Sequence, residues 1–190
     1  MWVSHPNRNI DSIAENINKM YKENYQNDES LALDVRGMVS ALGGSICQVP
    51  FLDMGVDSMN VEAWEKSTSG DKWEYVRFTI YVSMTDSRRR QNFTIAHELG
   101  HLYLHFLKWK DESTRKTTFK RLSYAVGGDM EREANMFAGA LLMPKSKYEE
   151  IYNEYGGDLI KIADIFDVSV SAAEVRARVL KLNEASSVVA

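Results

Sequence analysis

The chain has 190 residues, of which 44% are hydrophobic and 26% charged, with a formal net charge of −4 and one cysteine. This composition is that of one soluble globular domain with room for a small appendage, and the acidic balance argues against direct nucleic-acid binding. No stretch approaches the roughly 20 apolar residues of a membrane span, and residues 1–21 lack a signal-peptide core. Since Cys47 allows no intrachain disulfide, we expect a cytoplasmic protein in which Cys47 is a small buried core residue.

The N-terminal part of the chain predicts two helices and a short strand. Residues 8–27 are expected to form the first helix, because apolar side chains recur there on one helical stripe. The members of this stripe are Ile10, Ile13, Ile17, Met20 and Tyr21. A second helix is expected over residues 31–42, capped by Asp28 or Ser30 and ended by Gly43-Gly44. Residues 45–51 are expected to form a strand.

A longer strand is predicted over residues 72–84, where apolar and polar side chains alternate with a period of two. Its buried side chains are expected to be Val76, Phe78, Ile80, Val82 and Met84. Residues 61–66 could pair with it as a hairpin, which predicts a small, mainly antiparallel sheet. An extended substrate could add to an edge of this sheet. The segment 108–123 carries six Lys or Arg residues and is expected to be an exposed loop, with a basic rim of the active site as the minority interpretation.

The strongest functional signal lies in residues 93–105, which contain the pattern His97-Glu98-x-x-His101 and three of the four histidines. Helix residues four apart share a face and lie about 6 Å apart along the axis, so two imidazoles can bind one metal ion. Glu98 is placed to act as a general base on water, as in a zinc metalloprotease. The alternative is a pair of satisfied core histidines. The apolar flanks weigh against it, because a buried His-Glu-His cluster is costly without a metal or full pairing.

A catalytic zinc site usually has three protein ligands, so a third is expected elsewhere in the chain. His105 would lie about 12 Å beyond His97 along the helix, too far to share its metal, and could be a core histidine or a partner of a ligand. A helix is expected after Gly128, with Asp129 as its N-cap, and it offers Glu131 and Glu133. We favour Glu131, because it shares a face with the small residues Ala134 and Ala138 and with Asn135, which could hydrogen-bond a ligating histidine. Glu133 stays the alternative ligand, and otherwise a solvent-facing charge.

The C-terminal part of the chain is expected to be helical. Pro144 ends the preceding helix and begins another that runs through Tyr155 to Gly156-Gly157. Residues 158–182 predict two short helices around a turn at 167–169, similar to a helix-turn-helix. The expected buried positions are Ile160, Ala163, Phe166, Val168, Ala172, Val175, Val179 and Leu182. Because the second helix lacks a basic, amide-rich front, packing or substrate docking is favoured over DNA binding.

Three ordered blocks in residues 75–182 resemble the ImmA/IrrE family of bacterial zinc endopeptidases. The blocks are RQNFTIAHELGHLYLH, EREANMFAGALLMP and IADIFDVSVSAAEVRARVLKL. The resemblance implies an α+β fold, with a zincin-like catalytic core and a helix-turn-helix-like C-terminal element. It implies His97, His101 and Glu131 as Zn²⁺ ligands, with Glu98 catalytic. We therefore divide the chain into a peptidase domain, residues 1–157, and a C-terminal element, residues 158–190, as in the short, ImmA-like members. Residues 1–72 carry no motif that assigns them a role.

The resemblance also implies a function. Members of the family cut Xre-type helix-turn-helix repressors and so switch on genes of mobile elements, phages or stress responses. The expected partner is such a repressor. A further hydrogen-bond donor to the oxyanion is expected; Tyr124 and Tyr148 are candidates, and the sequence does not decide between them. The alternative is a DNA- or protein-binding regulator, similar to a toxin–antitoxin partner, whose zinc site is structural or unused.

Overall fold

A computed structural model of the chain describes residues 9–26, 28–50, 59–64, 75–105, 118–120 and 128–182. The chain divides into two compact units, residues 34–134, here the sheet unit, and residues 1–33 with 135–190, here the helical unit. Helix α4 (Gly128–Leu142) contributes its first turns to the sheet unit and the rest to the helical unit. The functional division at residue 157 that the sequence suggests stays a prediction.

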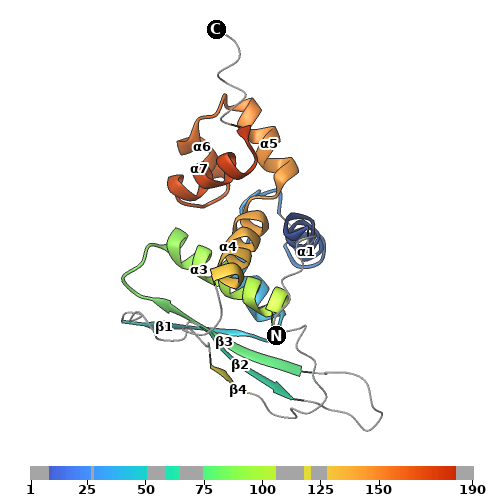
Figure 1. The fold of residues 1–190 in the computed structure, drawn as a ribbon, viewed down its shortest axis with the longest axis vertical. Helices are drawn as coiled ribbons and strands as arrows, with labels where there is room; N and C mark the ends of the chain where they lie inside the picture. The colour runs from blue at the N-terminus through green and yellow to red at the C-terminus, as the bar shows by residue number, and fades with distance from the viewer. Residues whose placement is uncertain are drawn as a thin grey trace. The chain divides into compact units, whose positions relative to one another are not determined.

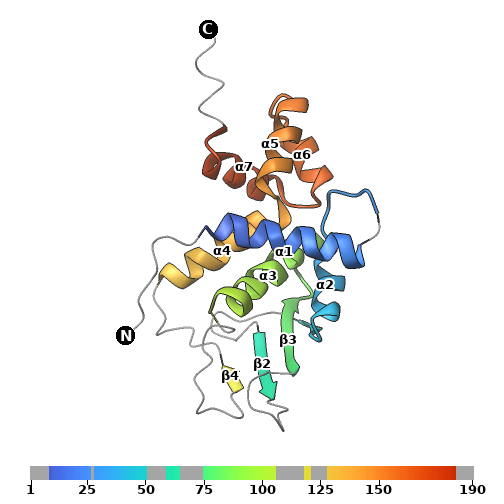
Figure 2. The ribbon, with the colours of Figure 1, turned by 90° about the vertical axis from the view of Figure 1, so that its right-hand side faces the viewer.

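Among the described residues, the sheet unit contains four strands in the order β1-β3-β2-β4 (Figure 1), and Figure 2 shows β2 between β3 and β4. Their bounds are β1 Ser45–Val49, β2 Met59–Trp64, β3 Tyr75–Ser83 and β4 Thr118–Lys120. β3 pairs in parallel with β1 and antiparallel with β2, and β2 pairs antiparallel with β4. In the described part of the chain, β3 is therefore an interior strand, and the sheet edges are β1 and β4.

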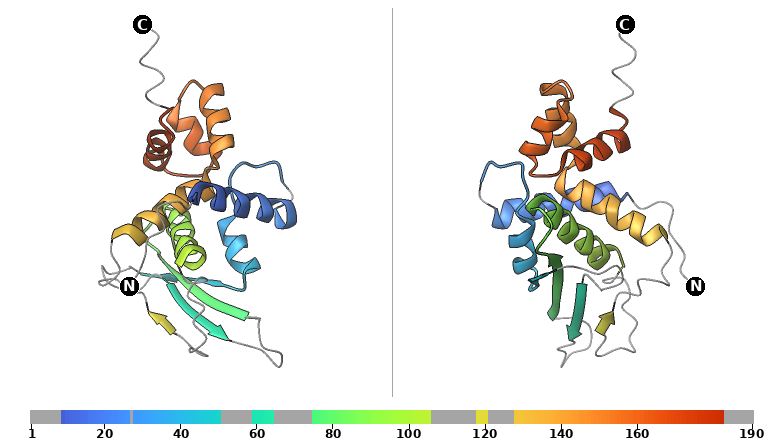
Figure 3. Two further views of the ribbon diagram at one scale, coloured as in Figure 1. Left: turned by 45° about the vertical axis from the view of Figure 1, so that its right-hand side comes forward. Right: turned by 90° about the vertical axis from the view of Figure 1, so that its left-hand side faces the viewer.

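Two helices cover this sheet. Helix α3 (Arg88–Gly100) lies along one face, and α2 (Val35–Ala41) packs beside α3 and β1 (Figure 3). Phe78, Ile80 and Val82 of β3 are buried and alternate with partly exposed Thr79 and Tyr81, which confirms the period-two prediction there. A Cβ atom on Gly44 would lie 2.4 Å from the Phe78 ring, so only glycine allows this close approach.

The start of α3 is fixed by side-chain hydrogen bonds. Ser87 Oγ accepts from the Arg90 N–H at 3.3 Å and so caps the helix. Gln91 is buried; its Nε2 donates to the Ser83 carbonyl at 2.7 Å, and its Oε1 accepts from Arg36 Nη2 at 2.6 Å. The first turn of α3 is thereby tied to the end of β3 and to α2.

The helical unit begins with α1 (Ile10–Tyr25), and the predicted stripe on it is partly wrong. Met20 is 63% exposed, whereas the buried positions are Ile10, Ala14, Asn18 and Tyr21. The buried face of α1 includes the polar residue Asn18, which a search for apolar periodicity does not place there. Asn18 Nδ2 donates to the Leu141 carbonyl at 2.7 Å, and this bond compensates the burial of an amide on the packed face.

Helices α5 (Lys145–Glu154), α6 (Leu159–Ile165) and α7 (Val170–Val179) form a cluster in the helical unit (Figure 1). Their bounds confirm the expected succession of three helices. Gly156 and Gly157 have positive φ angles of 58° and 79°, which end α5. The side chains of Asp158 and Ser169 cap α6 and α7.

The predicted buried face of α7 is wrong. Val175 and Val179 are 52% and 50% exposed, and Ile160 of α6 is 66% exposed. The face of α7 that is buried contains Ala173, Arg176 and Ala177. Arg176 is 3% exposed; its Nη1 lies 2.8 Å from Asp11 Oδ1, and its Nε donates to the Met143 carbonyl at 3.0 Å. These partners allow a charged side chain to occupy the packed face.

The prediction of a mixed fold of helices and strands is confirmed. Helix α2 is capped by Asp34, whose carboxylate accepts from the Gly37 N–H at 2.9 Å, and not by Asp28 or Ser30. Cys47 is exposed, not buried, because its register opposite Tyr81 places it on the side of β1 away from the core.

Three further expectations, on Met84, the loop 108–123 and Asp129, are corrected in whole or in part. Met84 follows the end of β3 and is 60% exposed. Within the expected loop 108–123, residues 118–120 form β4, and the other residues lie outside the described part. Asp129 lies inside the first turn of α4 and does not precede it. Among the described residues, none of the helices has the length and apolar character that crossing a membrane requires.

Candidate metal centre

The two predicted histidine ligands project from a helix that changes its winding between them. His97 lies in the last turn of α3, and His101 begins a π-helical segment, η1 (His101–His105). The imidazole centroids of His97 and His101 are 4.7 Å apart and their planes meet at 73°. Single π-helical turns of this kind are frequent at functional sites. The side chains are mostly enclosed, with 12% and 14% of their surfaces exposed.

Glu131 of α4 completes a group with these two histidines. Its Oε2 lies 3.3 Å from His97 Nε2, and its Oε1 lies 3.2 Å from His101 Nε2. The two Nε2 atoms are 3.1 Å apart. The structure thus brings together the three residues that the sequence singles out as ligands, and one potential ligand atom from each lies within 4.8 Å of the others.

This group fits a zinc ion. Tetrahedral zinc has metal–ligand distances of about 2.0–2.1 Å, which places neighbouring ligands about 3.3–3.4 Å apart. The observed separations of 3.1, 3.2 and 3.3 Å come close to that edge length. Two imidazoles and one carboxylate are also a ligand set found in catalytic zinc sites, which leave a fourth position open. His97, His101 and Glu131 would hold the ion.

Glu98 follows the first histidine and points away from bulk solvent. It is 2% exposed, which is unusual for a carboxylate that serves only solubility. On the helix it lies about 100° around from His97. A buried carboxylate in the sequence position after the first potential ligand is what the expected general base requires. Two residues after His101, burial raises the pKa of the Tyr103 phenol, which therefore stays protonated at neutral pH.

His105 is not one of the three possible ligands His97, His101 and Glu131, here the metal-ligating group. Its Nδ1 lies 3.0 Å from His101 Nδ1, the ring nitrogen on the other side from His97. Its Nε2 lies 3.0 Å from Glu133 Oε2. The interpretation of Glu133 as a solvent-facing charge is therefore wrong, because its side chain is only 13% exposed and binds a buried histidine.

Both glutamates of α4 reach the histidine helix, and helix geometry explains how. Glu131 and Glu133 lie about 200° apart around α4, with fully buried Ala134 in the remaining arc between them. The small Ala134 side chain allows close packing, and the longer glutamate side chains extend past it on either side. Glu131 meets His97 and His101, while Glu133 meets His105. Sequence reasoning treated the two glutamates as competitors for one role, whereas they contact different histidines.

Of the two expected oxyanion donors, Tyr148 is unsuited to that role. It is fully buried in the helical unit, and its hydroxyl donates to the Ala173 carbonyl. Burial, followed by the neighbouring Tyr152, raises its pKa to about 12. Tyr124 lies outside the described residues. The expected bond from Asn135 to a ligating histidine stays a prediction.

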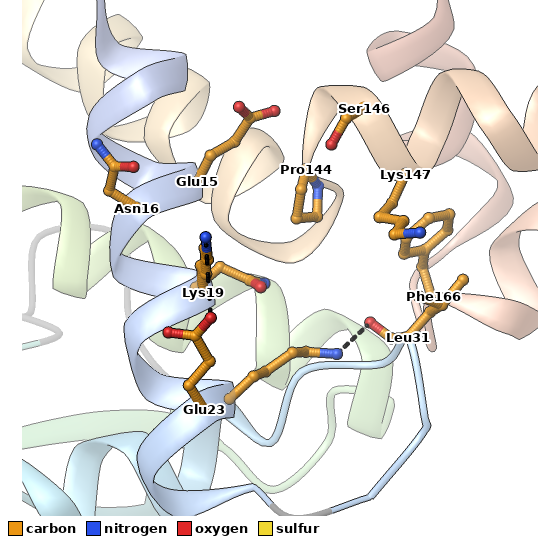
Figure 4. Close-up of a pocket in the computed structure, with 11 residues that line it drawn as sticks. Glu15, Asn16, Lys19, Glu23, Leu31, Pro144, Ser146, Lys147 and Phe166 are labelled. Atoms are coloured by element: carbon orange, nitrogen blue, oxygen red, sulfur yellow. Dashed lines mark hydrogen bonds and ion pairs between the residues drawn. The ribbon is translucent and has the colours of Figure 1, made fainter.

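A pocket of about 350 Å³ lies in the helical unit, and none of its lining residues belongs to the metal-ligating group (Figure 4). It is lined by α1 and by residues near Pro144 and Phe166, with Lys19, Lys22 and Lys147 at its wall. Each cation has a partner: Lys19 lies 3.8 Å from Glu23, Lys147 2.8 Å from Glu150, and Lys22 donates to two backbone carbonyls. Burial lowers the pKa of Lys22 against the attraction of Asp28. The pocket therefore offers no unpaired cation for an anionic ligand.

Comparisons with known proteins agree with this site. Residues 53–178 match the family model of the IrrE N-terminal-like domain, a group of M78 peptidases. A solved structure of a Mycobacterium tuberculosis transcriptional regulator is similar in fold, with a TM-score of 0.53 and 18% identity over 86% of this chain. The matched region is 44% of that protein, so the chain spans less than half of its length. No curated protein matches the chain in sequence.

Proposed function

Because the chain belongs to the IrrE N-terminal-like family of M78 peptidases, we propose that it is a zinc-dependent endopeptidase that cleaves a helix-turn-helix repressor. The observation that carries this proposal is the convergence of His97, His101 and Glu131 at separations of 3.1–3.3 Å beside buried Glu98. The family supports a metallopeptidase, and the geometry supports one metal ion held by two imidazoles and one carboxylate. The finer fold assignment, a zincin-like core, is part of the same proposal.

The mechanism follows from where the side chains lie. A zinc ion held by the three ligands would supply Lewis-acid chemistry, making water more acidic and a peptide carbonyl more electrophilic. Glu98 accepts a proton from the attacking water at its carboxylate and passes it to the nitrogen of the leaving amine. The enclosure of Glu98 by the core limits its exchange of protons with bulk solvent. His97 and His101 contribute neutral Nε2 lone pairs, while Glu131 contributes the one negative charge of the ligand set.

The sheet limits where an extended substrate can bind. Since β3 is an interior strand, a substrate segment that extends the sheet would pair with β1 or β4. β1 supports this proposal, because Ser45, Cys47 and Gln48 are exposed and β3 is the one strand that pairs with β1 in the described part of the chain. A helix-turn-helix-like role for α6 and α7 in docking the repressor is also a proposal, and their exposed side chains Ile160, Val175 and Val179 support it.

The second candidate is a DNA- or protein-binding regulator in which the metal site is structural or unused. The exposed apolar side chains of α6 and α7 would serve such binding equally well. Buried Glu98 favours the peptidase, because a structural site gains nothing from a carboxylate that is not a ligand. Salt-dependent binding of the purified chain to operator DNA would support the regulator.

The test is to incubate the purified chain with the repressor encoded next to it, with and without a chelator, under the conditions that induce the locus. We expect a discrete cleavage that the chelator abolishes and zinc restores. A Glu98→Gln variant should bind the repressor and zinc without cutting. An intact repressor in every tube, together with stable complex formation by both proteins, would contradict the peptidase and support the regulator.

A further inference from the structure

A line of contacts leads away from the metal-ligating group and ends at a carboxylate. His101 Nδ1 lies 3.0 Å from His105 Nδ1, and His105 Nε2 lies 3.0 Å from Glu133 Oε2. The side chains of His105 and Glu133 are 5% and 13% exposed, so bulk water does not compete freely for either hydrogen bond. Both residues are unused by the mechanism above.

The chemistry of these groups gives the chain of contacts a direction. An ionised carboxylate only accepts hydrogen bonds, so Glu133 requires the proton of neutral His105 to be on Nε2. The Nδ1 atom of His105 then carries a lone pair and accepts from His101 Nδ1–H. Neutral His101, with its proton on Nδ1, presents a lone pair at Nε2. That atom is the one that lies 3.1 Å from His97 Nε2 and 3.2 Å from Glu131.

We propose that His105 and Glu133 are positioning residues, which hold His101 in the tautomer whose Nε2 can bind the metal. This inference rests on the proposed metal site. A ligating histidine in a protein commonly donates its second ring N–H to a carboxylate or carbonyl, and such partners stabilise both tautomer and ring orientation. Here the carboxylate acts through a second histidine. Glu131 therefore lies at the Nε2 atom of His101, and Glu133 acts on the Nδ1 atom of the same ring through His105.

The π-helical segment makes this arrangement possible. His101 and His105 are the first and last residues of η1, which winds with more residues per turn than an α-helix. The two rings lie 5.0 Å apart with their planes at 50°, and their Nδ1 atoms face each other. The positioning of His101 thus explains both the π-helical winding of η1 and the presence of His105 at its end.

The tautomer can be read directly by ¹⁵N NMR of the histidine side chains in the metal-free protein. We expect His101 to carry its proton on Nδ1 in the wild type. In Glu133→Gln the amide can donate or accept, so the direction is no longer fixed, and we expect a mixture of tautomers at His101. Zinc affinity, measured by competition with a chromogenic chelator, should fall by roughly 10–100-fold in the same variant. A His105→Phe variant should show a comparable loss.

The matched control is Asp129→Asn, which removes one negative charge from the first turn of α4. Asp129 is 64% exposed at its side chain and forms an exposed ion pair of 3.2 Å with Arg132. We expect its zinc affinity to stay within about twofold of the wild type, because an exposed charge is screened. The relay is here the line of hydrogen bonds from Glu133 through His105 to His101. An equal loss of zinc affinity in both variants would mean that Glu133 acts only through its charge and would overturn the relay.

The outcomes separate this inference from the proposed function. Zinc bound by the wild type, with unchanged affinity and unchanged His101 tautomer in Glu133→Gln, overturns the relay and leaves the metal site standing. No zinc bound by the wild type overturns the metal site. The metal-free wild-type spectrum tests the relay without any variant, since a proton on Nδ1 of His105, or none on Nδ1 of His101, would contradict it even if every variant failed to fold.

Discussion

Among the described residues, each unit contains a cluster of ionisable side chains with a largely enclosed cationic or imidazole side chain, and the two clusters differ in the atoms that meet. In the helical unit, Arg176 Nε and Nη1 point at acceptors, the Met143 carbonyl and the Asp11 carboxylate. In the sheet unit, the Nε2 atoms of His97 and His101 and the carboxylate of Glu131 point at one another. In the cluster of the helical unit, the positive charge of Arg176 faces the negative charge of Asp11. The cluster of the sheet unit consists of groups that can all offer lone pairs, so it needs protons or a cation between them.

This difference shows how a structural ion pair can be told from a ligand site in a buried setting. A structural pair matches donors to acceptors, as the Nε and Nη1 atoms of Arg176 do, although its buried Nη2 has no partner among the described residues. A ligand site gathers acceptors at separations set by the ion, and surrounding residues fix which atoms point inward. The contrast makes measurable predictions. Substitutions in the helical cluster, Arg176 with Asp11, should change only the free energy of unfolding. Substitutions in the sheet cluster, His97, His101 and Glu131, should change metal affinity and activity.

The largest expected effect is on activity. Glu98→Gln should lower the rate of zinc-dependent cleavage by roughly 10²–10⁴-fold, because the amide cannot accept the proton of water. Its zinc affinity should stay near that of the wild type, since Glu98 is not a ligand. Single-turnover cleavage and zinc titration of the same preparation measure the two quantities. A variant that retains the wild-type rate would remove Glu98 from the mechanism.

The next effect is on the helical cluster. Arg176→Leu leaves Asp11 and the Met143 carbonyl without their donor and should lower the free energy of unfolding by about 2–4 kcal/mol, below the full cost of breaking a buried pair because Asp11 is partly exposed. Arg178→Leu on the same helix is the control, because its pair with Glu174 is exposed and should be worth about 0.5 kcal/mol or less. Urea unfolding measures both. Equal losses would show that burial of Arg176 does not matter.

Zinc should stabilise the sheet unit by mass action. At free zinc 100-fold above Kd, the free energy of unfolding should rise by about 2.7 kcal/mol, and the chelated protein should lose this gain. Glu131→Gln should show little or no zinc-dependent stabilisation at the same concentration, whereas Arg178→Leu should show all of it. Thermal unfolding with and without zinc measures the difference. Full stabilisation of Glu131→Gln would exclude Glu131 as a ligand.

The smallest effect is a pH dependence in the helical unit. The pKa of Tyr148 is raised to about 12, so the folded state keeps a proton that the unfolded state loses near pH 10. The contribution to stability is present below about pH 10 and is lost as the pH rises towards about 12. Tyr148→Phe should lower stability at neutral pH by about 1 kcal/mol and reduce this alkaline slope. An unchanged slope in the variant would assign the pH dependence to other groups.

The sequence predicted that His97, His101 and Glu131 lie close together, because their spacing has a physical cause. Residues four apart on a helix share a face, which placed His97 and His101 together, and the small Ala134 indicated close packing of the helix that carries Glu131. The pairing of His105 with Glu133 was missed. The π-helical turn changes the winding after His101, and nothing in the local sequence signals it.

Fold predictions failed where polar side chains take apolar positions. Apolar periodicity placed Val175 and Val179 in the core, but the buried face of α7 contains Arg176, and that of α1 contains Asn18. Both polar residues have partners distant in sequence, Asp11 and the Leu141 carbonyl, which no local pattern reveals. Cys47 is exposed for a similar reason, because its orientation depends on the register of β1 against β3.

The central claim is that two imidazoles and one carboxylate bind a single divalent ion. X-ray absorption at the zinc edge of the loaded protein tests it most directly, because imidazole rings give a distinctive scattering pattern. We expect one zinc per chain with two imidazole ligands and the remaining ligands oxygen, and one imidazole fewer in His101→Ala. Three imidazoles would place His105 on the metal, and a spectrum with none, or with sulfur, would contradict the site.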